Sequence, residues 1–454
     1  MDSEKIYLSM PRIAQEVLIN FAGLRIKNRR YGKEYFQLED EVIARRTLDG
    51  ISLEGYQNQR LKITLSEAVH SNYWKKQFHD YSVNINSAYS IDELKKLPVL
   101  TKDIVKENID GIFSSKYKKR DVIARHTSGT TGSGLFFYEN QSCEQETWAT
   151  WWRYRLQHGI DHSTLCGYFG GRSIVHLSQH KPPYWRMNRV GRQLMFSAYH
   201  LKEENALDYI KEITKKKIRW LHGYPSSISL LSKYILDQSI DTPPLVQTIS
   251  FGAESLTIPQ VETIKKAFPK AILIQHYGQA EGVANISQCT SGKLHVDEDF
   301  SLVEFIPVEY GINTYKMIGT NWINPIFPLL RYDTSDVVHI SDQQCNCGSK
   351  WRIVDDIDGR IEDFVTIPGG VKVGRLDHIF KDMVNIVEAQ VRQKECGSIQ
   401  INVVKNKKYS EIDEKLLLVE TRKRLGHEIK IRVSYVEKVP RTKSGKVRLV
   451  VSEL

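Results

Sequence analysis

Residues 218–251 read IRWLHGYPSSISLLSKYILDQSIDTPPLVQTISF, two short apolar runs with a helical pattern between them. Ile218–Leu221 and Thr248–Phe251 are strand-like, whereas Ser226–Leu236 spaces its apolar residues as a helix does. The same alternation extends from about Tyr168 to Ile274. Strands that alternate with helices are typical of a parallel sheet covered by helices, so the sequence predicts an α/β body. The other elements expected in this region are a strand at Ile174–Leu177, helices at Ala206–Lys217 and Gln260–Phe268, and a strand at Ile272–Ile274.

The chain has 454 residues, far more than one hydrophobic core usually holds, so we expect at least two domains. Shorter segments after Gly278 predict antiparallel strands and loops. We place a hinge at Gly359-Arg360, between an N-terminal body of residues 1–358 and a small α+β domain of residues 359–454. The elements expected in the small domain are helices at Leu376–Arg392 and Ile412–Leu425, and strands at Ile399–Val404 and Ile429–Val436.

The composition is that of an ordinary globular protein, with 41% hydrophobic and 26% charged residues. The 64 Lys and Arg residues outnumber the 54 Asp and Glu residues, and the net charge is +10. This charge favours anionic partners such as nucleotides, coenzyme A, acidic carrier domains or membrane surfaces. The basic residues are spread along the chain and nothing in the sequence places their clusters on one face, so nucleic acid is not expected as a partner.

No run of about 18 apolar residues predicts a membrane-spanning helix, and the first residues lack the apolar core of a signal peptide. We therefore expect a cytoplasmic protein whose six cysteines form no disulfides. Pro11–Arg30 has apolar residues at helical spacing and ends in a basic cluster. We expect this helix to dock on the protein body, and the alternative is a peripheral membrane helix.

A glycine-rich segment with alternating hydroxyl side chains follows His126 and reads TSGTTGSG, residues 127–134. Its backbone N–H groups can approach an anion closely and its hydroxyl groups add donors, so phosphate is the natural ligand. The segment lacks the lysine and the spacing of a Walker loop. The alternative is an ordinary surface loop.

Thr127–Gly132 resembles the T-S-G-T-T-G phosphate loop of the adenylate-forming superfamily, and further motifs of that superfamily follow in the same order. Gly252-Ala253-Glu254 resembles its adenine-side turn, and residues 277–281, YGQAE, resemble Y-G-x-[TS]-E. The later motifs are RYDTSD at 331–336, GRIED at 359–363 and PRTKSGK at 440–446. Six motifs in order argue against coincidence.

Two further segments narrow the resemblance to the phenylacetate-CoA ligase branch and its CapK-like capsular polysaccharide biosynthesis proteins. They are FAGL at 21–24, followed by RRYG at 29–32, and GYPSS at 223–227. The resemblance implies an acid–thiol ligase with a large multi-subdomain N-terminal body and a small, mobile C-terminal lid.

The resemblance also implies which residues contact ATP and catalyse its reaction. Lys446 is expected to bridge the substrate carboxylate and the α-phosphate, Glu281 to hold Mg²⁺, and Arg360 to follow the ribose and phosphate. The expected nucleotide contacts are Thr127, Ser128, Gly129, Thr130, Thr131, Gly132, Gly252, Ala253, Glu254, Gln275, His276, Tyr277, Gly278, Gln279, Ala280 and Asp336. Taken one at a time, Tyr277 also suits a core, Asp336 a turn, and Lys446 a solvated tail.

Three positions depart from the motifs of the superfamily. Ala280 stands where Thr or Ser is usual, Ser335 replaces a glycine, and Glu362 replaces the hinge Asp. These departures leave open a nucleotide-binding scaffold without catalytic activity as an alternative.

Three cysteines and one histidine have spacing that suits a metal. Cys289 and His295 lie six residues apart, and Cys345-Asn346-Cys347-Gly348 forms a short knuckle about fifty residues later. Three thiolates and one imidazole suit tetrahedral Zn²⁺, and the resemblance supports this interpretation because the same ligase branch carries similar sets. The alternative is four unrelated residues.

The function expected from the sequence is activation of a small carboxylic acid by ATP, with release of pyrophosphate and transfer of the acyl group to coenzyme A. A carrier-protein thiol or a sugar is the alternative acceptor. The residues around Trp220, His222 and Tyr224 are the expected acyl pocket. Neither the acid nor an oligomeric state follows from the sequence.

Overall fold

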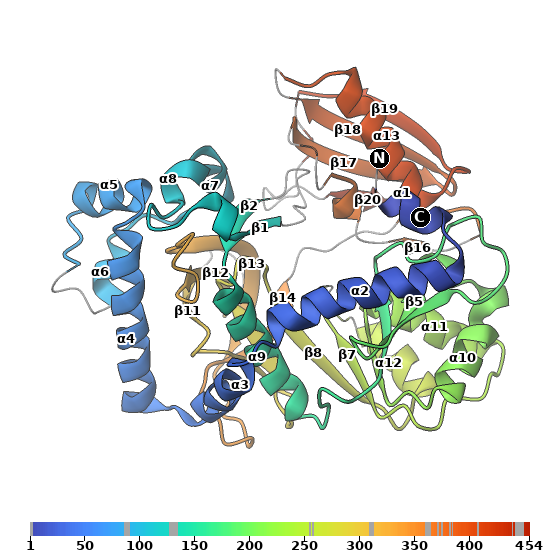
Figure 1. Cartoon of the computed structure of the whole chain (residues 1–454), viewed down its shortest axis with the longest axis horizontal. Coiled ribbons are helices and arrows are strands. Elements are labelled where there is room, and N and C mark those ends of the chain that lie inside the picture. The colour runs from blue at the N-terminus through green and yellow to red at the C-terminus, as the bar shows by residue number, and fades with distance from the viewer. Residues whose placement is uncertain are drawn as a thin grey trace.

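The computed structural model describes residues 3–85, 91–126, 135–253, 256, 258–307, 313–358, 365–369, 372–373, 376–380, 383, 385–405, 408–437, 439–440 and 449–454. A twelve-stranded sheet runs through the body in the order β11-β12-β13-β14-β10-β9-β8-β7-β6-β3-β5-β4. A second sheet of four strands contains the C-terminal residues (Figure 1). The predicted α/β class is confirmed.

One half of the large sheet is parallel and has helices on both faces. Its strands are β3 (Cys166–Gly170), β5 (Gln193–Ser197), β6 (Trp220–Gly223), β7 (Thr248–Phe251) and β8 (Ile272–Gly278), with β4 (Trp185–Asn188) antiparallel at the edge. Successive side chains of a strand point to opposite faces. Phe169 and Leu221 pack against α10 (Ala206–Lys215), α11 (Pro225–Asp237) and α12 (Ile258–Ala267). Cys166 and Trp220 face α9 (Gln141–Leu156) and α3 (Tyr35–Ala44).

The sheet changes from parallel to antiparallel between β8 and β9. The antiparallel half consists of β9 (Asn285–Gln288), β10 (Leu294–Val296), β11 (Ser301–Pro307), β12 (Thr314–Asn321), β13 (Tyr332–Ser341) and β14 (Ile353–Asp358). A two-stranded hairpin of β1 (Ile123–His126) and β2 (Phe136–Glu139) stands apart from this sheet and pairs His126 with Phe136. The segment 127–134 therefore joins two adjacent strand ends.

Short helices cover the end of the molecule beside the antiparallel half (Figure 1). They are α4 (Gly50–Ala68), α5 (Asn72–Asp80), α6 (Ile91–Lys95), α7 (Lys102–Glu107) and α8 (Ile109–Ile112). Side-chain caps begin two of them, because Ser71 accepts a hydrogen bond from Trp74 N and Thr101 accepts one from Ile104 N. Their apolar side chains share one buried cluster with residues 322–332 of the body.

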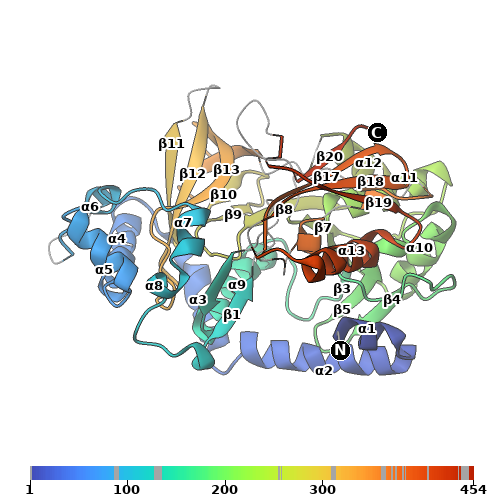
Figure 2. The same ribbon diagram turned by 90° about the horizontal axis from the view of Figure 1, so that it is seen from above.

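Helix α2 (Arg12–Arg30) follows α1 (Ser3–Ser9) and docks on the body, but through its polar and small residues. Gln15 accepts a hydrogen bond from Arg186 Nε at 2.6 Å, and Asn20 donates one to the carbonyl of Met187. The apolar stripe that predicted docking faces outward instead: Ile13 is 79% exposed, Val17 62% and Phe21 62%. In Figure 2 the helix lies along the outer edge of the molecule. The apolar stripe expected to face the body is therefore mostly exposed, although Ile19 packs against Val175 and Met195, and the docking itself is confirmed. Among the described helices, none is long and apolar enough to cross a membrane.

Two predicted elements are wrong. Residues 174–177 form no strand; the strand of this region is β3, and Val175 packs against Met195 beside it. The two glycines of CGYFG obscured β3, yet a Cβ on Gly167 would lie 2.7 Å from Leu221 Cδ2, so close packing requires glycine there. The expected helix at 376–392 is a short 3₁₀ turn at Leu376–Phe380 followed by β17 (Ile386–Glu395), because Ala389 and Val391 alternate into the core as strand residues do.

The C-terminal sheet has the order β19-β18-β17-β20 and is covered by α13 (Glu411–Leu425). The other strands are β18 (Ser398–Lys405), β19 (Lys430–Tyr435) and β20 (Val450–Ser452), with a small hairpin of β15 (Val365–Thr366) and β16 (Lys372–Val373) before them. Tyr199 and Leu177 of the body pack against this cluster, and Arg424 Nη1 donates to Tyr199 Oη at 3.3 Å. The hinge expected at Gly359-Arg360 lies outside the described residues, so the domain boundary stays a prediction.

Candidate functional site

The structure brings two of the expected nucleotide contacts together where the sheet changes direction. Tyr277, at the end of β8, donates from its hydroxyl group to Asp336 Oδ2 at 2.6 Å, and Gln279 Nε2 donates to the same oxygen at 2.9 Å. Asp336 belongs to β13 and is only 6% exposed. A buried carboxylate needs donors of this kind, so the side chain is fixed at the carboxyl end of β8.

The backbone around these residues includes two strained positions. Ala253, in the turn after β7, has φ of +70°, and Ser335, directly before Asp336, has φ of +61°. Residues with a Cβ rarely adopt such angles, which explains why the related motif has glycine at the second position. Gly252 lies beside β6, because a Cβ added there would be 4.0 Å from His222 Cε1. The third residue of this turn, Glu254, lies outside the described residues.

A chain of three hydrogen bonds connects the β1–β2 hairpin to Glu281. The side-chain amide of Asn324 donates to the carbonyl of Tyr138 at 2.8 Å. The backbone N–H of Asn324 donates to Asn321 Oδ1 at 3.0 Å. Asn321 in turn donates to the carbonyl of Glu281 at 2.5 Å. The hairpin that carries Thr127–Gly132 is thereby held near the loop after β8, although residues 127–134 themselves lie outside the described part.

The remaining expected contacts of β8 and its loop have different surroundings. Gly278 and Ala280 are exposed, whereas Glu281 is half-buried. The backbone N–H of Gln275 donates to Gln288 Oε1 at 2.8 Å, so this hydrogen bond links β8 to the end of β9. His276 points toward α9, with Nε2 2.8 Å from Asn285 Oδ1, and burial lowers the pKa of its imidazole to about 4. Arg360 and Lys446 lie outside the described residues.

Aromatic side chains fill the layer between α9 and β6, next to Gly252. Trp220 Nε1 donates to Ser250 Oγ at 2.7 Å, and His222 Nδ1 lies 2.8 Å from the same hydroxyl. The ring of Tyr168 stacks on that of His222. Burial, together with the charge of Arg155, lowers the pKa of His222 to about 3, so the imidazole is neutral. Trp220 and His222 were expected in an acyl pocket, and this layer is where the structure places them.

Helix α9 was not predicted from the sequence, although its segment WATWWRYR at 148–155 supplies much of this layer. Trp151 donates to Asn285 Oδ1 at 3.0 Å, and Arg153 forms buried ion pairs with Asp297 and Asp299 at 2.8 Å. A run of three tryptophans and two arginines in one helix was the available signal. It carries no motif of fixed spacing, which is why it was overlooked.

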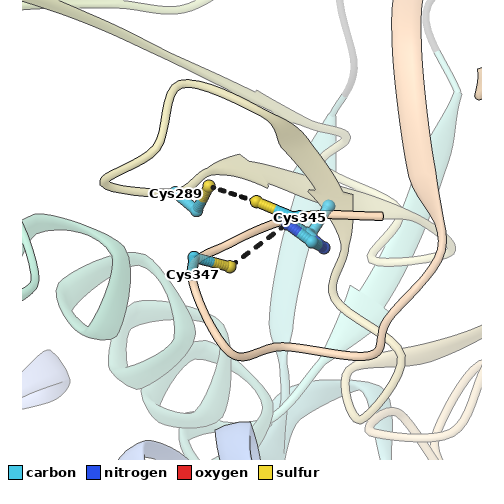
Figure 3. A group of neighbouring side chains, drawn as sticks. Cys289, Cys345 and Cys347 are labelled. Carbon is cyan, nitrogen blue, oxygen red and sulfur yellow. Dashed lines mark hydrogen bonds between the residues drawn. The ribbon is translucent and has the colours of Figure 1, made fainter. Parts of the chain in front are cut away.

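The four residues expected to bind a metal meet at one place. Cys289 lies in the turn between β9 and β10, His295 in β10, and Cys345 and Cys347 in the loop between β13 and β14. Figure 3 shows the three cysteine side chains turned toward one another. All four ligand atoms lie within 4.8 Å of one another, with Cys289 Sγ 3.6 Å from Cys345 Sγ and Cys347 Sγ 3.4 Å from His295 Nε2.

This donor set fits a tetrahedral zinc ion. With Zn–S distances of about 2.3 Å, ligand atoms lie about 3.8 Å apart, close to the separations found here. His295 Nδ1 lies 3.0 Å from the carbonyl of Trp351, which can only accept, so Nδ1 carries the proton and Nε2 keeps a lone pair for a metal. None of the six cysteines, all of which are described, is in a disulfide.

The fold resembles that of solved ligases in complex with an acyl-adenylate. A 2-hydroxyisobutyryl-CoA ligase in complex with 2-HIB-AMP and CoA, in the thioesterification state, matches with a TM-score of 0.58 and 16% identity over 90% of this chain and 91% of that chain. The postadenylation state of the same ligase with 2-HIB-AMP matches with a TM-score of 0.54 and 15% identity over 90% and 92% of the two chains. The chain therefore has the adenylate-forming ligase fold.

Sequence comparison specifies the family. Protein CapK of Staphylococcus aureus is 30% identical over an alignment of 460 residues that covers 99% of this chain and 99% of that protein. The model of the CapK C-terminal domain matches residues 366–453. The chain belongs to the CapK family.

Proposed function

We propose that the chain uses ATP to convert a carboxylic acid into an acyl-adenylate, with release of pyrophosphate. The observation that carries this proposal is the buried Asp336 carboxylate, held by Tyr277 and Gln279 at the carboxyl end of β8. Ligands of open α/β sheets bind outside the carboxyl ends of the strands, where the strand order changes direction. A fixed carboxylate at that place suits the two hydroxyl groups of a ribose.

The other roles follow from the motifs and the placement of their neighbours. Ser128–Gly132 would hold the β- and γ-phosphates, and the β1–β2 hairpin is anchored to the loop of Glu281. Mg²⁺ held by Glu281 would supply positive charge beside the phosphates. The acid attacks the α-phosphorus with its carboxylate, and pyrophosphate leaves. Lys446 would approach from the C-terminal domain and neutralise the two anions as they meet.

The acyl group would lie in the layer between α9 and β6, because this layer begins beside Gly252 and is lined by aromatic rings. Coenzyme A is the acceptor we propose, since the ligase with the same fold was solved with CoA. The relationship to Protein CapK favours a second candidate, transfer to a carrier thiol or a sugar in surface polysaccharide synthesis.

We also propose that Cys289, His295, Cys345 and Cys347 hold a structural zinc ion. Four protein ligands leave no open position for a substrate, so such an ion would stabilise the fold. It would fix the β9–β10 turn to the loop after β13, and both β9 and β13 adjoin residues of the proposed nucleotide site.

The test is exchange of labelled pyrophosphate into ATP across a panel of carboxylic acids. Exchange that depends on one class of acid supports the proposal and identifies the substrate. Absence of exchange with every acid, in protein that carries its metal and is folded, would overturn it. Thioester formation with coenzyme A then separates the two acceptors.

A further inference from the structure

Side chains on the sheet face beneath α9 keep accessible surface although they lie between a helix and a sheet. Trp151 and Arg155 of α9 are half-buried, and so are Tyr168, His222 and His276 on the strands opposite. Fully packed layers leave such residues without accessible surface, as Trp220 beside them nearly is. The layer in which the acyl group of the proposed reaction would lie is therefore lined by side chains that are not fully buried.

Arg155 has a guanidinium group with no hydrogen-bond acceptor among the described residues. Its Cζ lies 5.0 Å from the ring centre of Trp152, 5.4 Å from Trp148 and 5.5 Å from Trp220. These aromatic faces attract the cation but accept no directed hydrogen bonds from its five N–H groups. Burial lowers the pKa of the Arg155 guanidinium, which shows that water no longer stabilises the charge fully.

The titratable groups around Arg155 are all neutral. Burial raises the pKa of Tyr31, Tyr35, Tyr154 and Cys166, so these groups keep their protons. His222 and His276 are neutral because burial lowers their pKa. The carboxylate of Glu39 accepts from Tyr35 and lies 2.9 Å from His162 Nε2, and that of Glu144 accepts from Arg30. Among the residues that the structure describes, no carboxylate forms an ion pair with the Arg155 guanidinium.

Ser250 orients His222 so that the imidazole offers the layer a second hydrogen-bond donor. Its hydroxyl accepts from Trp220 Nε1, so its own proton can point to His222 Nδ1. A neutral His222 then carries its proton on Nε2. Arg155 and His222 would both donate, and an anionic or hydrogen-bond-accepting group would satisfy them.

The positions of these residues indicate how a bound acid would extend away from the nucleotide site. His222 lies beside Gly252 of the proposed nucleotide site, its ring is 6.1 Å from that of Trp220, and Trp220 is 5.5 Å from Arg155. An acid whose reacting carboxylate lies near Gly252 would therefore extend along aromatic rings toward the guanidinium.

We infer that the acid activated by this chain carries a second carboxylate at the end remote from the reacting one, and that Arg155 binds this second carboxylate. The inference rests on the proposed function, because it assigns the acyl group to the layer under α9. Arginine binds carboxylates through two parallel N–H bonds, and the tryptophan rings would hold the apolar segment between the two acid groups. Arg155 is then a residue that determines specificity.

The test uses matched pairs of acids that differ only in the remote carboxylate, such as phenylacetate and 4-carboxyphenylacetate, or hexanoate and adipate. Wild-type protein should exchange pyrophosphate with higher kcat/KM for the dicarboxylate of a pair. Arg155→Met should lose about 10- to 100-fold in kcat/KM for the dicarboxylate relative to the monocarboxylate of the same pair, mainly through KM. Arg155→Lys should retain part of the preference, and Arg120→Met, an exposed arginine paired only with Asp121, should behave as wild type.

A binding measurement separates this inference from the proposed function. Because three tryptophans surround Arg155, a dicarboxylate should change tryptophan fluorescence in wild-type protein without ATP, and Arg155→Met should abolish the change. Exchange that prefers monocarboxylates would overturn the inference and leave the proposed function intact. Dicarboxylate binding that survives in a folded Arg155→Met protein would also overturn it. Binding without exchange for any acid would overturn the proposed function instead.

Discussion

The Asp336 carboxylate is the residue on which the proposed nucleotide site depends, and its partners explain why it is fixed. One oxygen accepts hydrogen bonds from both Tyr277 and Gln279, so the side chain has little rotational freedom. The fold therefore orders this charged hydrogen-bond acceptor before a ribose binds, which reduces the side-chain entropy that binding would lose.

Replacing Asp336 should therefore weaken ATP binding without unfolding the protein. Asp336→Asn keeps the shape but loses the charge and turns one acceptor into a donor that faces Gln279 Nε2. We expect the Kd for ATP to rise about 10- to 100-fold, measured by isothermal titration. Tyr277→Phe removes one donor only and should raise the Kd less. An unchanged Kd in Asp336→Asn would exclude a ribose contact.

Ser335 shows why one departure from the superfamily motif is tolerated. Its φ of +61° costs about 1 kcal/mol for a residue with a Cβ, while glycine at the same position would lose backbone entropy of similar size. Its N–H donates to Asp333 Oδ1, which supports the turn.

We expect Ser335→Gly to leave the free energy of unfolding unchanged or slightly higher. Ser335→Val should lower it by more than about 1 kcal/mol, because a β-branched residue tolerates positive φ poorly. The side chain is exposed, so packing does not complicate the comparison. Denaturant unfolding measures both, and a stable Ser335→Val protein would contradict the strained backbone.

At the scale of single elements, the loop that carries Cys345 and Cys347 has no regular structure of its own. Four ligands from two turns and a strand would fix it if they share a zinc ion. Purified protein should contain about one zinc per chain by elemental analysis. Cys347→Ser should lose the metal and lower the melting temperature, and Cys396→Ser, at an exposed cysteine of the C-terminal domain, should do neither. Full zinc content in Cys347→Ser would contradict the assignment.

Helix α2 allows a test of which of its faces docks on the body, because its small residues face inward and most of its apolar residues face outward. A Cβ on Gly23 would lie 2.6 Å from Asn188 Oδ1, and that oxygen accepts from Gly191 N. Gly23→Ala should therefore cost about 1 to 3 kcal/mol of stability. Phe21→Ser, at a side chain 62% exposed, should change it by less than about 0.5 kcal/mol. The reverse order of effects would mean that α2 docks through its apolar stripe.

The sequence predicted elements whose periodicity is strong and local. Helix α10 and strand β7 have the expected positions, and β6 is shifted by two residues. The prediction from sequence failed where contacts with other elements decide the secondary structure. Gly167 of β3 is explained by the close approach of Leu221 and Ile218, and β17 has its strand form because β18 and β20 flank it. For the site, ordered motifs located Tyr277 and Asp336, whereas Arg155 acquires meaning only from the three rings around it.

At the scale of the whole molecule, the account requires two parts to cooperate. The body positions Asp336 and Tyr277, and the C-terminal domain carries the motif with Lys446. The two parts touch where Tyr199 and Leu177 of the body pack against the C-terminal apolar cluster and Arg424 donates to Tyr199 Oη. If Lys446 is the reacting cation, as proposed, closure of this domain would complete the site.

The most direct test is therefore pyrophosphate exchange by Lys446→Ala beside ATP binding by the same protein. The account predicts that exchange with the preferred acid falls by about 100-fold or more, while the Kd for ATP stays close to that of wild type. Exchange equal to wild type, in a folded variant that still binds ATP, would contradict the claim that this chain forms an acyl-adenylate with a lysine from its C-terminal domain.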